Sequence, residues 1–242
     1  MSNHNEFILK PIVNVLNEGV NACLGIGCGI ETYPLYDYIS QSLFLKMTGF
    51  QEQKMKCICW ELASNDYDYR RILLSNEDRL GECSSYEDKT KIYKRLVEQI
   101  CNYDCNFNAT TIDKKKILTT LKIDKMFSNT NFVSWSQVAF NNFKNIWRKI
   151  EVKHFVTDNQ SLFPEITNGI SLKIIYKNHL YKHRNKIAHN THSYQQNLPT
   201  LKTLLDENYK YENYFLWFAI LVLIDNIFIE LYKKYLTIIE DN

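Results

Sequence analysis

Glycine and proline are scarce in this chain, and their scarcity constrains its fold more than any other sequence feature. Only 7 glycines and 4 prolines occur among 242 residues. These residues end helices and form most tight turns, so a fold of many short strands would need more of them. The sequence therefore predicts long helices packed into an all-α helical bundle.

The length of the chain suits one domain with a sizeable core. Hydrophobic residues make up 45% of the chain and aromatic residues 14%, which indicates a well-packed interior and excludes a disordered protein. We expect residues 1–242 to form a single helical domain with an elaborated N-terminal region.

Apolar periodicity and helix-breaking residues locate the expected elements. Pro34 stands where a first-turn proline is tolerated, so it predicts the start of a long helix. Pro164 and Pro199 are expected to mark further helix starts, although Asn168-Gly169 can delay or kink the helix after Pro164. Residues 65–85 are expected to form a loop with a short helical piece. Helices are predicted at about 7–16, 35–63, 89–101, 113–126, 134–150, 172–190 and 211–239.

Tyr214–Ile224 is a run of eleven apolar residues. A helix that spans a membrane needs about 20 such residues. Asp225, Asn226 and Glu230 follow the run closely. The sequence therefore predicts a central buried helix and no membrane partner.

The seven cysteines indicate a reducing compartment. Their number is odd, no CxxC pair occurs and no signal peptide precedes them, so we expect a cytoplasmic protein whose thiols pack in the core. The spacings Cys57-x-Cys59 and Cys101-x3-Cys105 fit structural zinc poorly. No cofactor or metal is expected.

Acidic residues are missing from residues 166–205, although the net charge of the chain is only +2. A local positive field of this kind suits a polyanion, but a solvated basic face is the ordinary alternative. The window contains Lys173, Lys177, Lys182, Arg184, Lys186 and Lys202, together with His179, His183, His189 and His192.

Arg184, Asn185 and His189 stand together inside this window. A guanidinium can bind a phosphate through two hydrogen bonds, and histidine is the side chain that most often transfers protons in catalysis. Residues four apart share a helix face, so a helix would place Asn185 and His189 side by side. These residue types suit cleavage of a phosphodiester.

The run Arg184-Asn185-Lys186-Ile187-Ala188-His189 resembles the R-x(4–6)-H signature of the HEPN superfamily, including the Asn that often follows the Arg. The resemblance covers these six residues by motif and the remainder by general helicity, with about 160–242 as the motif-bearing part. It implies a helical bundle, commonly a homodimer, and a metal-independent endoribonuclease of a toxin or antiphage defence system. It also implies that Arg184 and His189 are catalytic, with Asn185 as a positioning residue.

RNA cleavage can be derived from these residue types without a metal. The 2′-OH is the nucleophile, so the enzyme must deprotonate it, stabilise the phosphorane and protonate the leaving 5′ oxygen. The motif of one chain supplies a single His189, whereas the reaction needs an acid and a base. A two-fold homodimer with facing motifs would supply both. The expected products are a 2′,3′-cyclic phosphate and a 5′-OH.

Lys182, Lys186 and His183 are the candidate RNA contacts, although the two lysines can equally be ordinary solvated side chains. Asn185 can alternatively pack or cap, and Glu52 and Lys56 form an i,i+4 pair that either supports the site from inside or lies exposed. The RNA partner, whether tRNA or mRNA, is left open. An antitoxin or a larger defence complex is a further possible partner.

Two alternatives compete with this interpretation. A non-catalytic HEPN-like dimer that binds RNA or protein would keep the basic surface. A metalloenzyme would use His179 with His183, or His189 with His192, but no HExxH motif or nearby carboxylate completes such a site. One branch of HEPN toxins, those paired with a minimal nucleotidyltransferase, carries a modifiable Tyr two residues after the motif His. This chain has Thr191 there, with Tyr194 as the nearest tyrosine, which argues against control by such a partner and not against ribonuclease activity.

Overall fold

The computed structural model describes residues 3–27, 29–75, 83–120, 123–189 and 207–241. These residues form helices and irregular segments and contain no strand, which confirms the all-α bundle predicted from the scarcity of glycine and proline. Their buried hydrophobic side chains form one continuous core that includes residues from Ile8 to Ile238.

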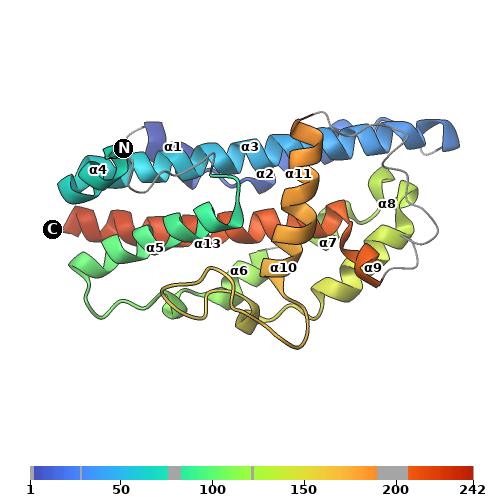
Figure 1. The fold of residues 1–242 in the computed structure, drawn as a ribbon. Coiled ribbons are helices and arrows are strands. Elements are labelled where there is room, and N and C mark those ends of the chain that lie inside the picture. Colours follow the sequence, from blue (N-terminus) through green and yellow to red (C-terminus); the bar gives the residue numbers. More distant parts are fainter. Residues whose placement is uncertain (1–2, 28, 76–82, 121–122, 190–206, 242) are drawn as a thin grey trace.

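Two long helices, α3 (Tyr33–Asn65) and α13 (Tyr214–Asp241), run side by side along the molecule (Figure 1). The two helices are parallel, because an earlier residue of α3 contacts an earlier residue of α13 and a later residue contacts a later one. The ring of Phe44 lies 5.4 Å from that of Trp217, and the amide of Asn65 lies 3.3 Å from the hydroxyl of Tyr235. The long helices predicted at 35–63 and 211–239 are thereby confirmed.

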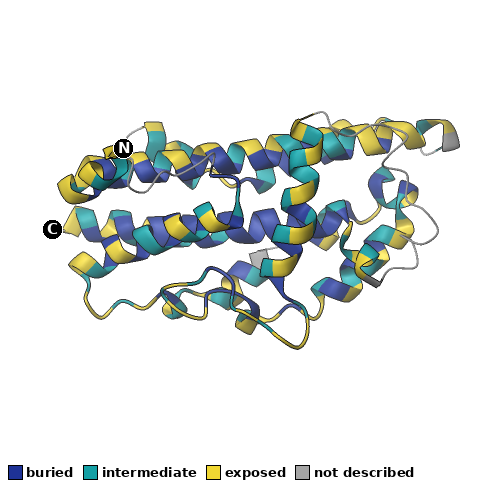
Figure 2. Cartoon of the chain, viewed as in Figure 1, coloured by how far each residue is buried: buried dark blue, intermediate teal, exposed yellow. Residues whose placement is uncertain are grey.

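The helix α13 is the most deeply buried element that the structure describes, as Figure 2 shows. By length and composition it is the one described helix apolar enough to cross a membrane, yet 83% of its apolar window is buried inside the bundle. This is the central helix predicted from the apolar run at Tyr214–Ile224.

A buried ion pair joins the two long helices. The ammonium of Lys54 lies 2.7 Å from the carboxylate of Asp225, and both residues are almost completely buried. The second oxygen of Asp225 accepts the backbone N–H of Ile12 at 2.7 Å. One carboxylate therefore connects α13, α3 and the start of α2.

The N-terminal segment forms α1 (Asn3–Leu9) and α2 (Val13–Ala22), which both pack against α3. A single helix at 7–16 was the wrong prediction. Pro11 lies between the two helices, and proline cannot donate the backbone hydrogen bond that a continuous helix needs there.

The remaining helices surround the long pair. α5 (Tyr86–Tyr103) packs along α13, and α4 (Tyr67–Leu74) is the short helical piece expected after α3. The helix predicted at 113–126 is described as two helical segments on either side of residues 121–122, which lie outside the described residues, and a non-helical Ser136 precedes the main part of the helix predicted at 134–150. The two predicted helices correspond to α6 (Lys114–Thr120), α7 (Ile123–Phe127), α8 (Asn131–Trp135) and α9 (Gln137–Trp147).

Pro164 does not start a helix, contrary to the prediction. Gly169 has a φ of 123°, which no helix can contain, so the chain stays irregular until Ser171. The hydroxyl of Ser171 caps the next helix by accepting the backbone N–H of Ile174. The expected start at Pro199 lies outside the described residues.

The motif-bearing helix begins at Leu172 and runs without a break to Ala188. It consists of α10 (Leu172–Ile175), a π-helical turn (Tyr176–Leu180) and α11 (Tyr181–Ala188). We call this continuous helix the motif rod. In Figure 1 it crosses α3 and α13 at a steep angle, and its α11 part packs against α3.

Candidate functional site

The N-terminal half of the motif rod contacts α5 and the segment that precedes α5. Tyr176 is buried, and its hydroxyl donates a 2.7 Å hydrogen bond to the carbonyl of Ser84. The ammonium of Lys177 lies 2.5 Å from the carboxylate of Glu87 in α5. These contacts determine where α11 emerges over α3.

Within the described part of the chain, Glu52 and Asn185 both contact Arg184. Its Nη2 lies 3.1 Å from Oε2 of Glu52 in α3, and its Nη1 donates to Oδ1 of the neighbouring Asn185 at 3.1 Å. The side chains of Arg184 and Glu52 are only 14% and 11% exposed. The guanidinium therefore has one orientation relative to α3.

Glu52 faces inward and takes part in the candidate site, so of the two alternatives for this residue the structure favours support of the site. Its second oxygen accepts a 2.9 Å hydrogen bond from Lys56, whose side chain remains 44% exposed. Glu52 thus lies between two cations, one on the motif rod and one on its own helix.

A buried lysine lies close to this pair. Lys89 in α5 is 1% exposed, and its ammonium donates to the carbonyl of Cys83 at 2.9 Å. Burial lowers the pKa of Lys89 to about 8, although Glu52 is among the groups that act in the opposite direction. The sequence did not predict that Lys89 is buried, because lysine is rarely fully buried and no local pattern marks this exception.

His189 stands at the C-terminal cap of α11 and is exposed. Its backbone N–H donates to the carbonyl of Asn185 at 3.1 Å, so the i→i−4 hydrogen bonding of the helix extends to His189. Arg184, Asn185 and His189 therefore lie within the last turns of one helix, with the guanidinium against α3 and the imidazole at the surface.

His183 does not lie with the exposed basic residues. Its Nε2 is 2.8 Å from the hydroxyl of Tyr214, and its ring centroid lies 4.5 Å from that of Trp217. Phe44 completes this aromatic cluster. The position favours packing against α13 over the RNA contact predicted for this residue.

The segment 166–205 has no acidic residue of its own, but carboxylates from other parts of the fold pair with its cations. Arg184 pairs with Glu52, Lys177 with Glu87 and His179 with Glu212. The positive field that the sequence indicated is therefore largely compensated. Lys182 and Lys186 both remain exposed, as an RNA contact or an ordinary solvated lysine would be.

No group of three or more potential metal ligands occurs among the described residues. His179 and His183 have separate partners, Glu212 and Tyr214. His192, Thr191 and Tyr194, which figured in the alternatives, lie outside the described residues.

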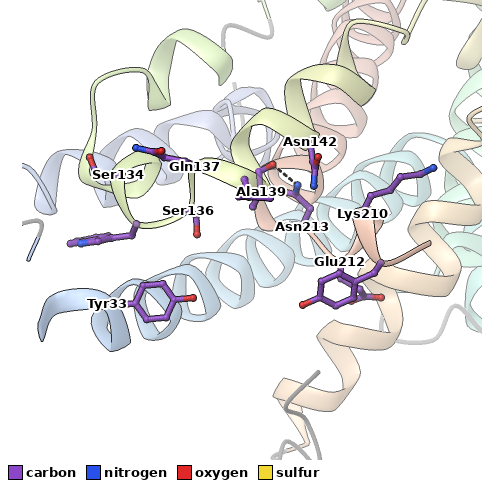
Figure 3. Close-up of a pocket in the computed structure, with 12 residues that line it drawn as sticks. Tyr33, Ser134, Ser136, Gln137, Ala139, Asn142, Lys210, Glu212 and Asn213 are labelled. Atoms are coloured by element: carbon purple, nitrogen blue, oxygen red, sulfur yellow. Dashed lines mark hydrogen bonds between the residues drawn. The ribbon is translucent and has the colours of Figure 1, made fainter. Parts of the chain in front are cut away.

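A pocket beside the motif rod had no signal in the sequence. It has a volume of about 470 Å³ and lies between the start of α3, the α8–α9 region and the segment before α13 (Figure 3). Its wall includes Glu212, which lies 2.6 Å from His179 of the motif rod. Residues from three distant parts of the chain form it, so no local pattern could have located it.

Comparison with known proteins gives no relative of this chain. No family model, no curated protein and no solved structure is detectably similar to it.

Proposed function

We propose that this protein is a metal-independent endoribonuclease of the HEPN type, acting in the cytoplasm as a toxin or antiphage defence effector. The observation that carries the proposal is the arrangement of Arg184, Asn185 and His189. Arg184 is oriented by Glu52 and Asn185, and His189 lies exposed at the end of the same helix. An oriented cation on the same helix as an accessible proton carrier suits phosphodiester cleavage.

The proposed reaction is a transesterification within the RNA. A base removes the proton of the 2′-OH, the 2′ oxygen bonds to phosphorus, and the bond from phosphorus to the 5′ oxygen breaks. An acid protonates the departing 5′ oxygen. The products are a 2′,3′-cyclic phosphate and a 5′-OH end, and DNA resists cleavage because it lacks the 2′-OH.

Arg184 stabilises the negative charge that develops on the phosphorane. Glu52 holds the guanidinium plane in place before substrate arrives, which lowers the cost of reorganisation during the reaction. Asn185 contributes through its contact with Arg184. Lys182 and Lys186, both exposed on the motif rod, add sequence-independent attraction for the RNA backbone.

Two copies of the chain complete the proposed site. His189 is exposed, so a second His189 can approach it across a two-fold axis. One imidazole then acts as the base and the other as the acid. The homodimer is part of the proposal for this chemical reason.

The decisive experiment compares wild type with His189→Ala, using His4→Ala as a matched control. His4 pairs with Glu61 and lies on α1. Wild type and His4→Ala should cut single-stranded RNA in EDTA and leave 5′-OH ends, and a 2′-O-methyl group at the cut should block the reaction. His189→Ala should lose at least 100-fold in rate, because it removes both acid and base from the dimer.

Full cleavage by His189→Ala would refute the proposed catalytic role of the motif. Loss of cleavage by wild type in EDTA, restored by a divalent cation, would instead establish a metal-dependent enzyme. Sequencing of the 5′-OH ends from cells that express the protein would identify the target, for which a tRNA anticodon loop and mRNA are both open.

A second function is favoured by the burial of Arg184. A guanidinium that is 14% exposed and paired with a carboxylate also serves to lock a helix in place. On this reading the chain is a non-catalytic HEPN-like dimer that binds RNA or another protein. Such a module would bind RNA equally well with and without His189 and would cleave none.

A further inference from the structure

The pocket beside the motif rod has the features of a nucleobase site. We propose that it binds one base of the RNA substrate several nucleotides away from the scissile phosphate, and so sets the sequence preference of cleavage. This inference rests on the proposed ribonuclease function and deepens it. The volume of about 470 Å³ lies within the range of ordinary small-ligand sites, roughly 300–1,000 Å³.

Tyrosine side chains supply flat surfaces in the pocket. Tyr33 at the start of α3 is 53% exposed, and Tyr209 contributes a second ring from the segment before α13. Figure 3 shows Tyr33 on one side and Glu212 on the other, with the hydroxyl of Tyr33 directed into the space between them. Aromatic side chains of this kind stack on nucleobases.

Two amide side chains supply the hydrogen bonds that a base edge requires. Asn142 and Gln137 of α9 line the pocket, and within the described part of the chain neither amide has a hydrogen-bond partner. Asn213 differs, because its amide donates to the carbonyl of Ala139 at 2.7 Å and accepts the N–H of Phe215. An amide presents both donors and an acceptor, as the edge of a base does.

The charges of the pocket favour a base over a phosphate. Lys210 and Glu212 are its charged lining residues, and they have opposite signs. A phosphate site would need an excess of cations or oriented N–H groups. A neutral aromatic ring with polar edges fits this balance better.

The pocket lies within reach of an RNA strand bound at the motif. Glu212 of its wall contacts His179 on the motif rod. Tyr33 of the pocket and Glu52, the partner of Arg184, are 19 residues apart on α3, which is roughly 28 Å along the axis at a rise of about 1.5 Å per residue. Several nucleotides of single-stranded RNA can span this distance, with a splayed base in the pocket and the scissile phosphate at Arg184.

The first test measures binding without cleavage. Full-length protein carrying His189→Ala is titrated against fluorescent single-stranded RNAs that differ in one base at each position. Tyr33→Leu and Asn142→Ala, added to this background, should each weaken binding of the preferred base by about fivefold to a hundredfold, the range expected for loss of stacking. Tyr38→Leu and Asn141→Ala are matched controls on the same helices, outside the pocket, and should leave binding unchanged.

The second test maps cleavage by protein with His189 intact. Tyr33→Leu and Asn142→Ala should cut more slowly and lose the base preference at one position several nucleotides from the cut, whereas both controls keep it. Unchanged preference in the pocket variants overturns the subsite and leaves the ribonuclease proposal intact. Base-selective RNA binding that needs Tyr33, in a wild type that cuts no RNA, overturns the enzyme and supports the subsite.

A small-ligand role is the remaining alternative for the pocket. Adenosine, guanosine, cytidine and uridine monophosphates are titrated against the same proteins. Binding of a mononucleotide that depends on Tyr33, with no base preference for RNA, overturns the proposal and assigns the pocket to a free nucleotide.

Discussion

At the scale of single residues, Glu52 decides how Arg184 can act. It lies 132 positions before Arg184 in the chain and yet meets its guanidinium at 3.1 Å. A carboxylate in this position both compensates the charge and fixes the direction of the side chain. The orientation of Arg184 therefore depends on a residue outside the motif.

Glu52→Gln should reduce kcat by on the order of a hundredfold with little change in KM, because the guanidinium loses its orientation rather than its contact with RNA. Steady-state cleavage of a labelled RNA measures the two constants. Glu61→Gln is the matched control, since Glu61 lies on the same helix and pairs with His4. A rise in KM with unchanged kcat would show that Glu52 does not position the catalytic group.

Arg184→Lys should also lose activity, by at least tenfold, although it keeps the positive charge. A lysine ammonium lacks the planar fork that contacts Glu52 and Asn185 together. Cleavage rate and far-UV circular dichroism are measured in parallel. Activity equal to that of wild type would mean that charge alone is sufficient.

At the scale of elements, the parallel helices α3 and α13 depend on a buried ion pair. Lys54 and Asp225 are both removed from water, and burial lowers the pKa of Lys54 and raises that of Asp225. Each charge is tolerated because the other is present, and Asp225 also accepts the N–H of Ile12. Loss of one partner leaves an uncompensated charge in the core.

Lys54→Met and Asp225→Asn should each lower the free energy of unfolding by about 3–5 kcal/mol. The double variant should be more stable than either single variant, because it buries no charge and the Asn side chain can still accept the N–H of Ile12. Urea denaturation of wild type, the two single variants and the double variant gives the free energies of a double-mutant cycle. Additive losses in the double variant would show that the two groups are not coupled.

The N-cap of α4 gives a pH dependence. Asp66 accepts the backbone N–H of Tyr69 at 3.0 Å and also binds the amide of Gln99. Burial acts to raise the pKa of Asp66, but the hydrogen bonds from Tyr69, Gln99 and Asp68 outweigh it and lower the pKa below the ordinary 3.8. The unfolded chain thus binds this proton more readily than the folded one.

The contribution of Asp66 should be fully present above about pH 4 and disappear as the pH falls through its lowered folded-state pKa. Asp66→Asn keeps a cap acceptor but not the charge, so it should cost about 1 kcal/mol at pH 7 and less at pH 3. Urea unfolding at both pH values measures the difference. A cost that is equal at pH 7 and pH 3 would contradict this assignment.

At the scale of the whole molecule, the proposed mechanism makes cleavage depend on two chains, because each chain supplies a single His189 in the motif. A heterodimer of wild type and His189→Ala, purified through two different tags, should retain less than a tenth of the wild-type activity, since it lacks either the acid or the base. Light scattering should give twice the 28.7 kDa chain mass. Full activity of a monomer would rule out the shared site.

The helical class and the long helices followed from local properties. Few glycines and prolines, a proline at position 34 and an apolar run at Tyr214–Ile224 act within a few turns of helix, so they can be interpreted without tertiary contacts. The break at Pro11 was not predicted, whereas the delay of the helix after Pro164 occurs at Gly169, where the sequence allowed for it. In both places a backbone restriction outweighed the hydrophobic periodicity.

The sequence by itself determined an all-α chain and placed Arg184, Asn185 and His189 on one helical segment. Only the tertiary structure decided the electrostatics of that segment, because Glu52, Glu87 and Glu212 come from distant elements and pair with its cations. It also decided that His183 packs in an aromatic cluster and that Tyr33 and Asn142 share a pocket. Helix formation depends on neighbours along the chain, whereas charge compensation and pockets depend on neighbours in space.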